Sequence, residues 1–143
     1  MLVTNHVLSG ALIGAAAPGP VTAFLAGVAS HFLLDTVPHW GDVEFDEMVP
    51  IGVRDGLVGL TAMALVSART PRDRRPRVLA AMSGAAFPDL DKPSLLFFGR
   101  SPFPRTWDSF HVRIQRESRD RMPQEFVVGG VLLVVALRVV RRG

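Results

Sequence analysis

Residues 1–34 have the sequence MLVTNHVLSGALIGAAAPGPVTAFLAGVASHFLL and contain no charged side chain. Pro18-Gly19-Pro20 interrupts this apolar stretch, and such a run cannot continue a helix. The stretch therefore predicts two antiparallel helices, over residues 4–17 and 21–36. A cleavable signal peptide is the competing interpretation, and it is disfavoured because no Lys or Arg precedes Arg54, so the basic amino-terminal region of a signal peptide is missing.

Two further apolar segments contain a few polar residues. Residues 51–68 predict a third helix, which only Arg54 and Asp55 interrupt. Residues 78–98 predict a fourth helix, but the sequence from Pro88 to Pro93 carries two prolines and two aspartates in its middle. We therefore expect the fourth helix to be broken, with a first part that ends near Pro88.

The carboxyl-terminal segment, residues 125–140, is the most clearly lipid-facing sequence. A bilayer core needs about 20 mostly apolar residues per helix, and the helices of residues 1–34 and 125–140 lack the polar outward face of a soluble bundle. We therefore expect residues 1–143 to form one all-α domain, a multi-pass helical bundle of four to five helices in the cell membrane. Residues 99–123 are polar and predict a loop. A small soluble helical bundle is the alternative.

The composition narrows the functional class. The chain has 143 residues, which suffice for one domain, and no cysteine, which excludes disulfide scaffolds, thiol enzymes and cysteine zinc sites. Any metal must therefore be held by His and carboxylate side chains. The net charge is only +3, and arginines that flank membrane helices explain it better than nucleic-acid binding, so no specific nucleic acid is expected as a partner.

Following the predicted helices across the membrane places all four histidines on one side. His6 precedes the first crossing, and the second helix returns to the same side. The loop after it, the start of the third helix and the end of the fourth helix lie there too. The ionisable residues gathered on this side are His6, His31, Asp35, His39, Asp55, Asp89, Asp91 and His111.

His31 and Asp35 are the strongest local signal for a metal site. They are four residues apart on one helix, so they project from the same face and can reach one divalent ion. His39 follows Pro38, where a regular helix is not expected to continue. Each residue also has a simpler interpretation: His31 and Asp35 as a hydrogen-bonded pair between helices, and His6 as an ordinary polar residue near the chain start.

The same holds for the remaining candidates. Asp55 next to Arg54 is explained by charge neutralisation, and Asp89 after Pro88 by a turn. His111, in the polar segment, is explained as an exposed histidine. A metal site is favoured because all of these residues are predicted to lie on the same side of the membrane.

Three motifs together resemble a family, the predicted membrane-bound metal-dependent hydrolases. The motifs are Asn5-His6, His31-Phe-Leu-Leu-Asp35-Thr-Val-Pro-His39-Trp40 and Phe87-Pro88-Asp89-Leu90-Asp91, and the likeness covers residues 4–115. These small multi-pass proteins are similar to zinc-dependent phospholipase C and to nucleases of the S1/P1 type. The resemblance implies that His6, His31, Asp35, Asp89 and Asp91 lie near the metal, with Asp55 and His39 as further candidates.

The chain departs from the family pattern at two places. Lys92 stands where many members have a histidine directly after the Pro-Asp-Leu-Asp element. Members also tend to carry a His-Arg…Thr-His-Ser stretch downstream, whereas this chain offers only His111, followed by Val112-Arg113. Four histidines are few for a three-zinc cluster, so one or two metal ions are expected, and loss of catalysis is an open alternative.

The leading hypothesis is a membrane-embedded hydrolase of an ester or phosphoester at the bilayer surface, with membrane lipids as partners and a lipid or phosphoester as substrate. Its cofactor is a divalent metal, zinc first and manganese second, and its catalytic residues are Asp35 and Asp89. Arg100, Arg105 and Arg113 are the candidates for binding an anionic head group. A non-catalytic membrane scaffold with a structural or degenerate metal site is the alternative, and an ion or proton transporter is a third class.

Overall fold

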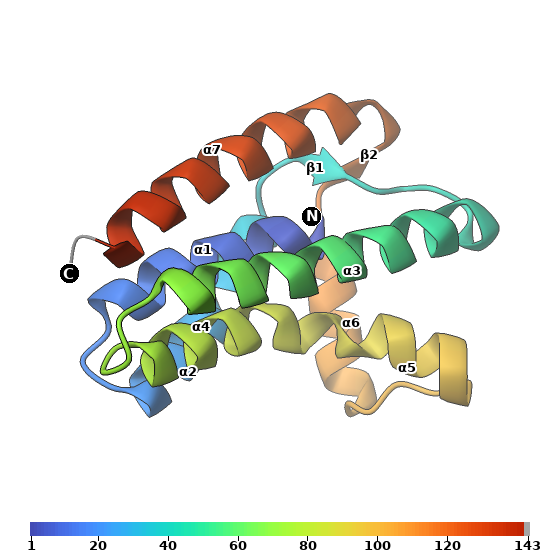
Figure 1. Cartoon of the computed structure of the whole chain (residues 1–143). Coiled ribbons are helices and arrows are strands. Elements are labelled where there is room, and N and C mark those ends of the chain that lie inside the picture. The colour runs from blue at the N-terminus through green and yellow to red at the C-terminus, as the bar shows by residue number, and fades with distance from the viewer. Residues whose placement is uncertain (142–143) are drawn as a thin grey trace.

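The computed structural model describes residues 1–141, which fold mainly into helices (Figure 1). The predicted all-α class is confirmed. The α-helices are α1 Val3–Ala16, α2 Pro20–Asp35, α3 Phe45–Arg69, α4 Arg75–Ala86, α5 Asp91–Phe98, α6 Arg105–Ile114 and α7 Met122–Arg141. The 3-10 helices are η1 Phe87–Leu90 and η2 Arg119–Arg121, and the strands are β1 His39–Trp40 and β2 Glu117–Ser118. These two short strands pair in parallel, His39 opposite Glu117.

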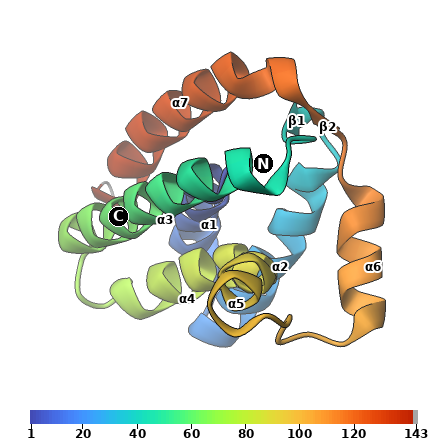
Figure 2. The same ribbon diagram turned by 90° about the vertical axis from the view of Figure 1, so that its right-hand side faces the viewer.

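Helix α1 lies at the centre of the bundle, where it packs against α2, α3, α4 and α7 (Figure 2). Consecutive long helices run in opposite directions, so the α3–α4 connection and the carboxyl terminus lie at one end (Figure 1). The amino terminus, β1 and α6 lie towards the other. Apolar residues of α1, α3, α4 and α7, among them Leu8, Val66, Met82 and Val140, form the core around α1. This antiparallel threading is what brings the polar residues of α1, α2 and η1 together.

Glycines let α1, α2 and α4 approach closely. A Cβ atom at Gly84 of α4 would overlap the backbone of Phe24 in α2, and one at Gly27 would overlap the backbone of Ala81. The same holds for Gly10 and Gly14 of α1, at which an added Cβ atom would overlap the backbone of α4. The backbones are therefore in direct contact, and they hold the polar ends of these helices at fixed positions.

The third and fourth helices differ in how well the sequence predicts them. Helix α3 begins at Phe45, six residues before the predicted start at residue 51, and continues through Pro50. Asp46 and Glu47 lie in its first turn, where negative charge stabilises a helix. The fourth helix is broken as predicted, because the turn η1, with Pro88 in its first residues, separates α4 from α5.

The predicted loop over residues 99–123 is wrong over part of its length, because residues 105–114 form helix α6. Trp107, His111 and Ile114 recur at helical spacing on one face. Phe32 of α2 makes edge-to-face contacts with Trp107, Phe110 and His111. The aromatic face of α6 thus packs on α2, and its charged residues made the segment resemble a loop.

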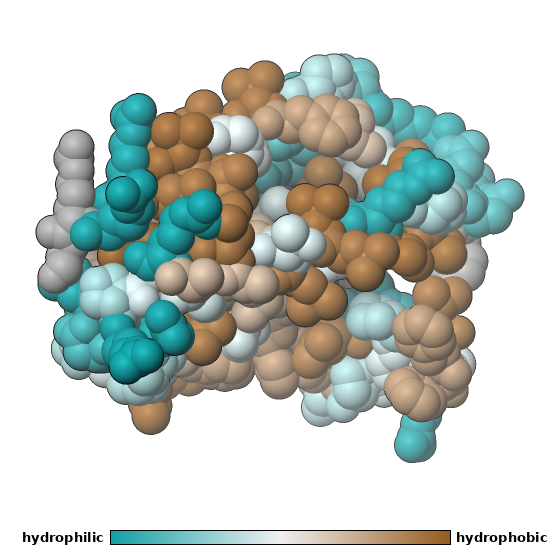
Figure 3. All heavy atoms as spheres, viewed as in Figure 1, coloured by the Kyte–Doolittle hydropathy of each residue, from teal (hydrophilic) through white to brown (hydrophobic). Residues whose placement is uncertain are grey.

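Two helices are long and apolar enough to cross a membrane by length and composition, over residues Asp46–Arg69 and Arg119–Arg141. Only 17% of each apolar window is buried, so their apolar side chains mostly face outward. Helices α1 and α2 have 14 and 16 residues, or about 21 and 24 Å, which is shorter than a hydrocarbon core of about 30 Å. Figure 3 shows hydrophobic residues across the middle of one face, between hydrophilic groups towards either end.

Candidate metal centre

Four imidazoles from four different elements surround the carboxylate of Asp35. His6 Nε2 lies 3.1 Å from Oδ1, while His31 Nε2 and His111 Nε2 lie 3.1 and 3.0 Å from Oδ2. His39 Nε2 is 4.0 Å from Oδ1. The four histidines and Asp35 are all between 0% and 2% exposed, so this polar cluster is removed from bulk solvent.

Backbone carbonyls fix the orientation of two of these imidazoles. His31 Nδ1 lies 2.7 Å from the carbonyl oxygen of Ala85, and His39 Nδ1 lies 2.7 Å from that of Val37. A carbonyl oxygen only accepts hydrogen bonds, so each Nδ1 carries a proton and donates it. With Nδ1 protonated in this way, a metal would be bound through Nε2, the usual arrangement around metal-bound histidine.

Some buried nitrogens of the cluster make no hydrogen bond at all. Both ring nitrogens of His6 and Nε2 of His39 have none, although His6 Nε2 lies close to the Asp35 carboxylate. By contrast, His31 Nε2 and His111 Nε2 are within hydrogen-bond distance of each other, at 3.0 Å, and His111 Nε2 also lies 3.0 Å from Asp35 Oδ2. Buried polar atoms normally have partners. A divalent ion would satisfy these lone pairs, and imidazole nitrogen with carboxylate oxygen is a donor set that zinc accepts.

Asp89 extends the centre towards η1 and α5. One oxygen of Asp89 can share a metal ion with His6 and His31, and Asp89, Asp91 and His111 form a second such group, in each case with ligand atoms within 4.8 Å of one another. Asp35, His31 and His111 form a third. The structure thus brings together most of the sequence-predicted ligands, in groups that overlap and could hold one or two ions.

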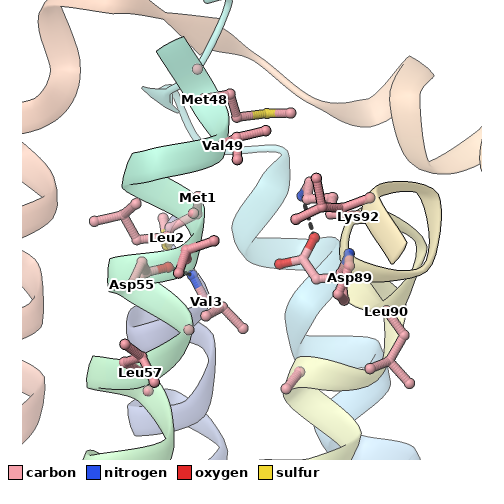
Figure 4. A pocket seen from close by; sticks show the side chains of 18 of the residues that line it. Met1, Leu2, Val3, Met48, Val49, Asp55, Leu57, Asp89, Leu90 and Lys92 are labelled. Atoms are coloured by element: carbon pink, nitrogen blue, oxygen red, sulfur yellow. Dashed lines mark hydrogen bonds and ion pairs between the residues drawn. The ribbon is translucent and has the colours of Figure 1, made fainter. Parts of the chain in front are cut away.

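Lys92 occupies the polar edge of this arrangement. Its ammonium group forms an ion pair with Asp89, drawn as a dashed line in Figure 4. Burial alone would raise the pKa of Asp89, but Lys92, His31 and His6 hold it well below its usual range. Burial likewise opposes the charge of Lys92, yet Asp89 raises its pKa above the ordinary value. Asp89 is therefore a carboxylate, and Lys92 supplies its counter-charge.

Two groups of predicted site residues lie outside the cluster. The carboxylate of Asp55 accepts hydrogen bonds from the backbone nitrogens of Val3 and Thr4, at 2.6 and 3.3 Å, and from the Thr4 hydroxyl. Asp55 thus satisfies the free amino end of α1, which explains its burial without a metal. The predicted head-group ligands are all exposed, and none of them lines the cavity beside the centre: Arg100, Arg105 and Arg113.

Sequence reasoning missed Glu125, a buried carboxylate at the start of α7. Its side chain accepts hydrogen bonds from Leu2 N at 3.0 Å, Asn5 Nδ2 at 2.7 Å and Trp40 N at 3.1 Å. Asn5 and Trp40 are the direct neighbours of His6 and His39. Through these hydrogen bonds Glu125 connects the two segments that carry His6 and His39. Its place at the edge of the most apolar helix was the available signal, because such a carboxylate needs partners.

No protein-family model, no curated protein and no solved structure matches this chain. The membership in a hydrolase family that the three motifs suggest therefore stays a prediction, and the centre stands on its geometry.

Proposed function

We propose that this protein is a multi-pass membrane protein with a metal-dependent hydrolase centre, acting on an ester or phosphoester at the bilayer surface. The convergence of four buried Nε2 atoms on Asp35 carries the proposal. Helix packing alone gives no reason to bury the Nε2 atoms of His6 and His39 without hydrogen-bond partners, whereas binding of a divalent ion, zinc or alternatively manganese, does.

The outer surface supports the membrane assignment. Large apolar side chains are exposed along three helices: Val21, Leu25 and Leu33 of α2, Val53, Leu57, Val58 and Leu60 of α3, and Phe126, Val127, Val131 and Val134 of α7. Soluble monomers rarely expose contiguous apolar areas of this extent. A lipid environment would cover them, and α1 and α2 would cross it in contact with the longer helices.

The chain's own residues suit hydrolysis. His6, His31, His111 and Asp35 would hold the metal, which when bound supplies Lewis acidity and lowers the pKa of water towards about 7. Asp89 lies 3.9 Å from His31 Nε2 and faces the adjacent cavity, where it could accept a proton from an attacking water. Lys92 beside it would bind a negatively charged oxygen of the substrate.

Metal analysis of the detergent-purified protein, prepared without chelator or affinity His tag, tests the metal centre. We expect one or two zinc or manganese ions per chain in the wild type and in Asp73→Asn, which changes an exposed carboxylate, and a loss of metal in His31→Ala and Asp35→Asn. Full metal occupancy in Asp35→Asn would remove this residue from the ligand set. No metal in the wild type, even after reconstitution, would overturn the hydrolase proposal.

One observation favours a second function, a non-catalytic membrane scaffold with a structural metal site. The four imidazoles are at most 2% exposed, and structural sites are closed by protein ligands whereas catalytic sites keep one position open. Cobalt-substituted protein distinguishes the two. A change in its visible spectrum on adding phosphate indicates an open position and favours the hydrolase, and an unchanged spectrum favours the scaffold.

A further inference from the structure

A large apolar cavity of about 660 Å³ lies beside the metal centre. One wall is α3 together with the start of α1, and the opposite wall is η1 and α5 (Figure 4). Asp89 belongs to both the cavity wall and the metal-ligand groups. The cavity therefore borders the centre at Asp89. Its volume is within the range of about 300–1,000 Å³ found for small-molecule sites.

The cavity is polar next to the centre and apolar beyond it. Asp55 and Asp89 lie on opposite walls, with Lys92 above Asp89 in Figure 4. Beyond this pair, the walls are formed by apolar side chains of α1, α3 and η1: Val7, Leu57, Leu60, Met63 and Leu90. These α3 residues follow Asp55 along the helix, so the apolar part extends along a candidate membrane span, away from the end that holds the cluster.

The rim of the cavity is also apolar. Leu57 and Leu60 on α3 are 61% and 65% exposed, and Phe97 on α5 is 73% exposed. An opening bordered by such side chains on a membrane helix faces hydrocarbon rather than water. A molecule that enters the cavity through this opening would come from the lipid phase.

Glycines on α3 keep the cavity open. Gly52 and Gly56 are one helical turn apart and both line it, and a Cβ atom added at either position would meet no atom within 4 Å. Glycine weakens a helix interior by up to about 1 kcal/mol relative to alanine. Larger side chains would be tolerated by the fold and would fill the cavity instead.

We propose that this cavity binds one acyl chain of a membrane glycerophospholipid, with the phosphoester or ester group held at the metal centre. The inference rests on the proposed function, since it names the substrate class of that centre. The two parts of such a lipid would fit the two parts of the cavity. The hydrocarbon would lie against the α3 wall, and the negatively charged phosphate would lie near the ammonium group of Lys92, whose side chain is 39% exposed. Asp55 does not repel it strongly, because that carboxylate is bound by donors from α1.

Photo-crosslinking tests the proposal with a readout independent of catalysis. The probe is a phosphatidylcholine with a diazirine at the end of one acyl chain, titrated into the full-length protein in detergent micelles. We expect saturable labelling of wall residues that surrounding lipid hardly reaches, Val7, Met63 and Ala86, in both metal-loaded and chelator-treated protein. Unlabelled long-chain phosphatidylcholine should compete, and a dibutanoyl analogue with the same head group should not.

Gly56→Leu should weaken this labelling by about tenfold or more, because each methylene group displaced from an apolar site costs about fourfold in affinity. Gly130→Leu is the matched control: Gly130 lies on exposed α7, has equal space around its Cβ position and is remote from the cavity. It should leave labelling at the cavity unchanged.

The outcomes separate the two proposals. Labelling that does not saturate, that is equal in wild type and Gly56→Leu, or that the dibutanoyl analogue displaces would overturn acyl-chain binding while leaving the metal centre intact. Saturable, leucine-sensitive labelling of a protein that binds no metal would support the lipid site and refute the hydrolase.

Discussion

Replacing Glu125 by glutamine tests whether the carboxylate at the start of α7 positions the metal centre. Glu125 is 2% exposed. Oε2 accepts from Leu2 N and Asn5 Nδ2, and Oε1 accepts from Trp40 N. A glutamine amide has one oxygen and one NH2 group, so Glu125→Gln must place a donor against a donor on at least one side.

The magnitude follows from counting these contacts. The least costly orientation keeps the amide oxygen on Leu2 and Asn5 and turns the NH2 group towards Trp40 N. One charge-assisted hydrogen bond is then lost and two become weaker, and with about 1.5–3 kcal/mol for a hydrogen bond to a charged group the fold loses about 3 kcal/mol. For a chain of this length that corresponds to a melting temperature lower by about 10 °C.

Metal affinity should fall as well. The freed Trp40 is the neighbour of His39 in β1, so the imidazole loses its fixed position, and loss of supporting contacts typically costs about 10–100-fold in metal affinity. Circular dichroism in detergent gives the melting temperature, and competition with a chelating dye gives the zinc dissociation constant. Glu47→Gln is the control, because Glu47 is an exposed carboxylate that pairs with Arg119, and such an exposed pair is worth about 0–1 kcal/mol. If Glu125→Gln behaves like Glu47→Gln in both assays, Glu125 does not position the centre.

Three further predictions concern packing, the departure from the family motif, and pH. Gly84→Val should prevent folding or lower the melting temperature by more than about 10 °C, since its side chain would overlap the backbone of Phe24, whereas Gly130→Val should shift it by a few degrees at most. Lys92→His should raise the metal content measured by elemental analysis, because it removes the ammonium from the ion pair and adds an imidazole beside the centre; an unchanged content would mean that position 92 lies outside the ligand set. Burial is the main cause that lowers the pKa of His39 below the ordinary 6.5. The unfolded chain therefore binds this proton first, and chelator-treated protein should lose stability as the pH falls below about 6.5; a melting temperature that is constant between pH 7.5 and 5.5 would contradict this.

The sequence predicts the parts of the centre that local spacing and helix order determine. His31 and Asp35 share one helix face because they are four residues apart. His6 and Asp89 reach them because antiparallel helices return to the same end, which could be deduced from the apolar segments and the break at Pro88. His111 could be assigned to the same end but not placed, since its position depends on α6 packing against Phe32 through contacts between residues far apart in the chain.

Other features depend on three-dimensional packing that a single sequence does not display. Asp55 looks like a metal ligand because it is an acid in an apolar helix, yet its partners are the backbone nitrogens of Val3 and Thr4, about 50 positions away. The pairing of β1 with β2 places Glu117 opposite His39, and two residues per strand are too few to leave a periodic signal. Three arginines were predicted to bind the head group only because the sequence places them on the same side of the membrane as the histidines. In the structure they are exposed and do not line the cavity: Arg100, Arg105 and Arg113.

Small residues and polar residues occupy different parts of the helix bundle. At Gly27 and Gly84 there is no room for a side chain, because the backbones of α2 and α4 are in direct contact there. At the end of α2, the same bundle leaves room for Asp35 and four imidazoles, although leucine or phenylalanine would fill that volume without the cost of desolvating polar atoms. The hydrogen bonds from His31 Nδ1 and His39 Nδ1 to carbonyl oxygens then leave each Nε2 directed at the carboxylate. A lone pair facing a carboxylate is unfavourable unless a proton or a cation lies between them. The amino-terminal ammonium group of Met1 lies 3.1 Å from Asp35 Oδ1 and His111 Nε2 is hydrogen-bonded to Oδ2. The proposed metal ion would supply further positive charge, and Asp89 links the cluster to the apolar cavity.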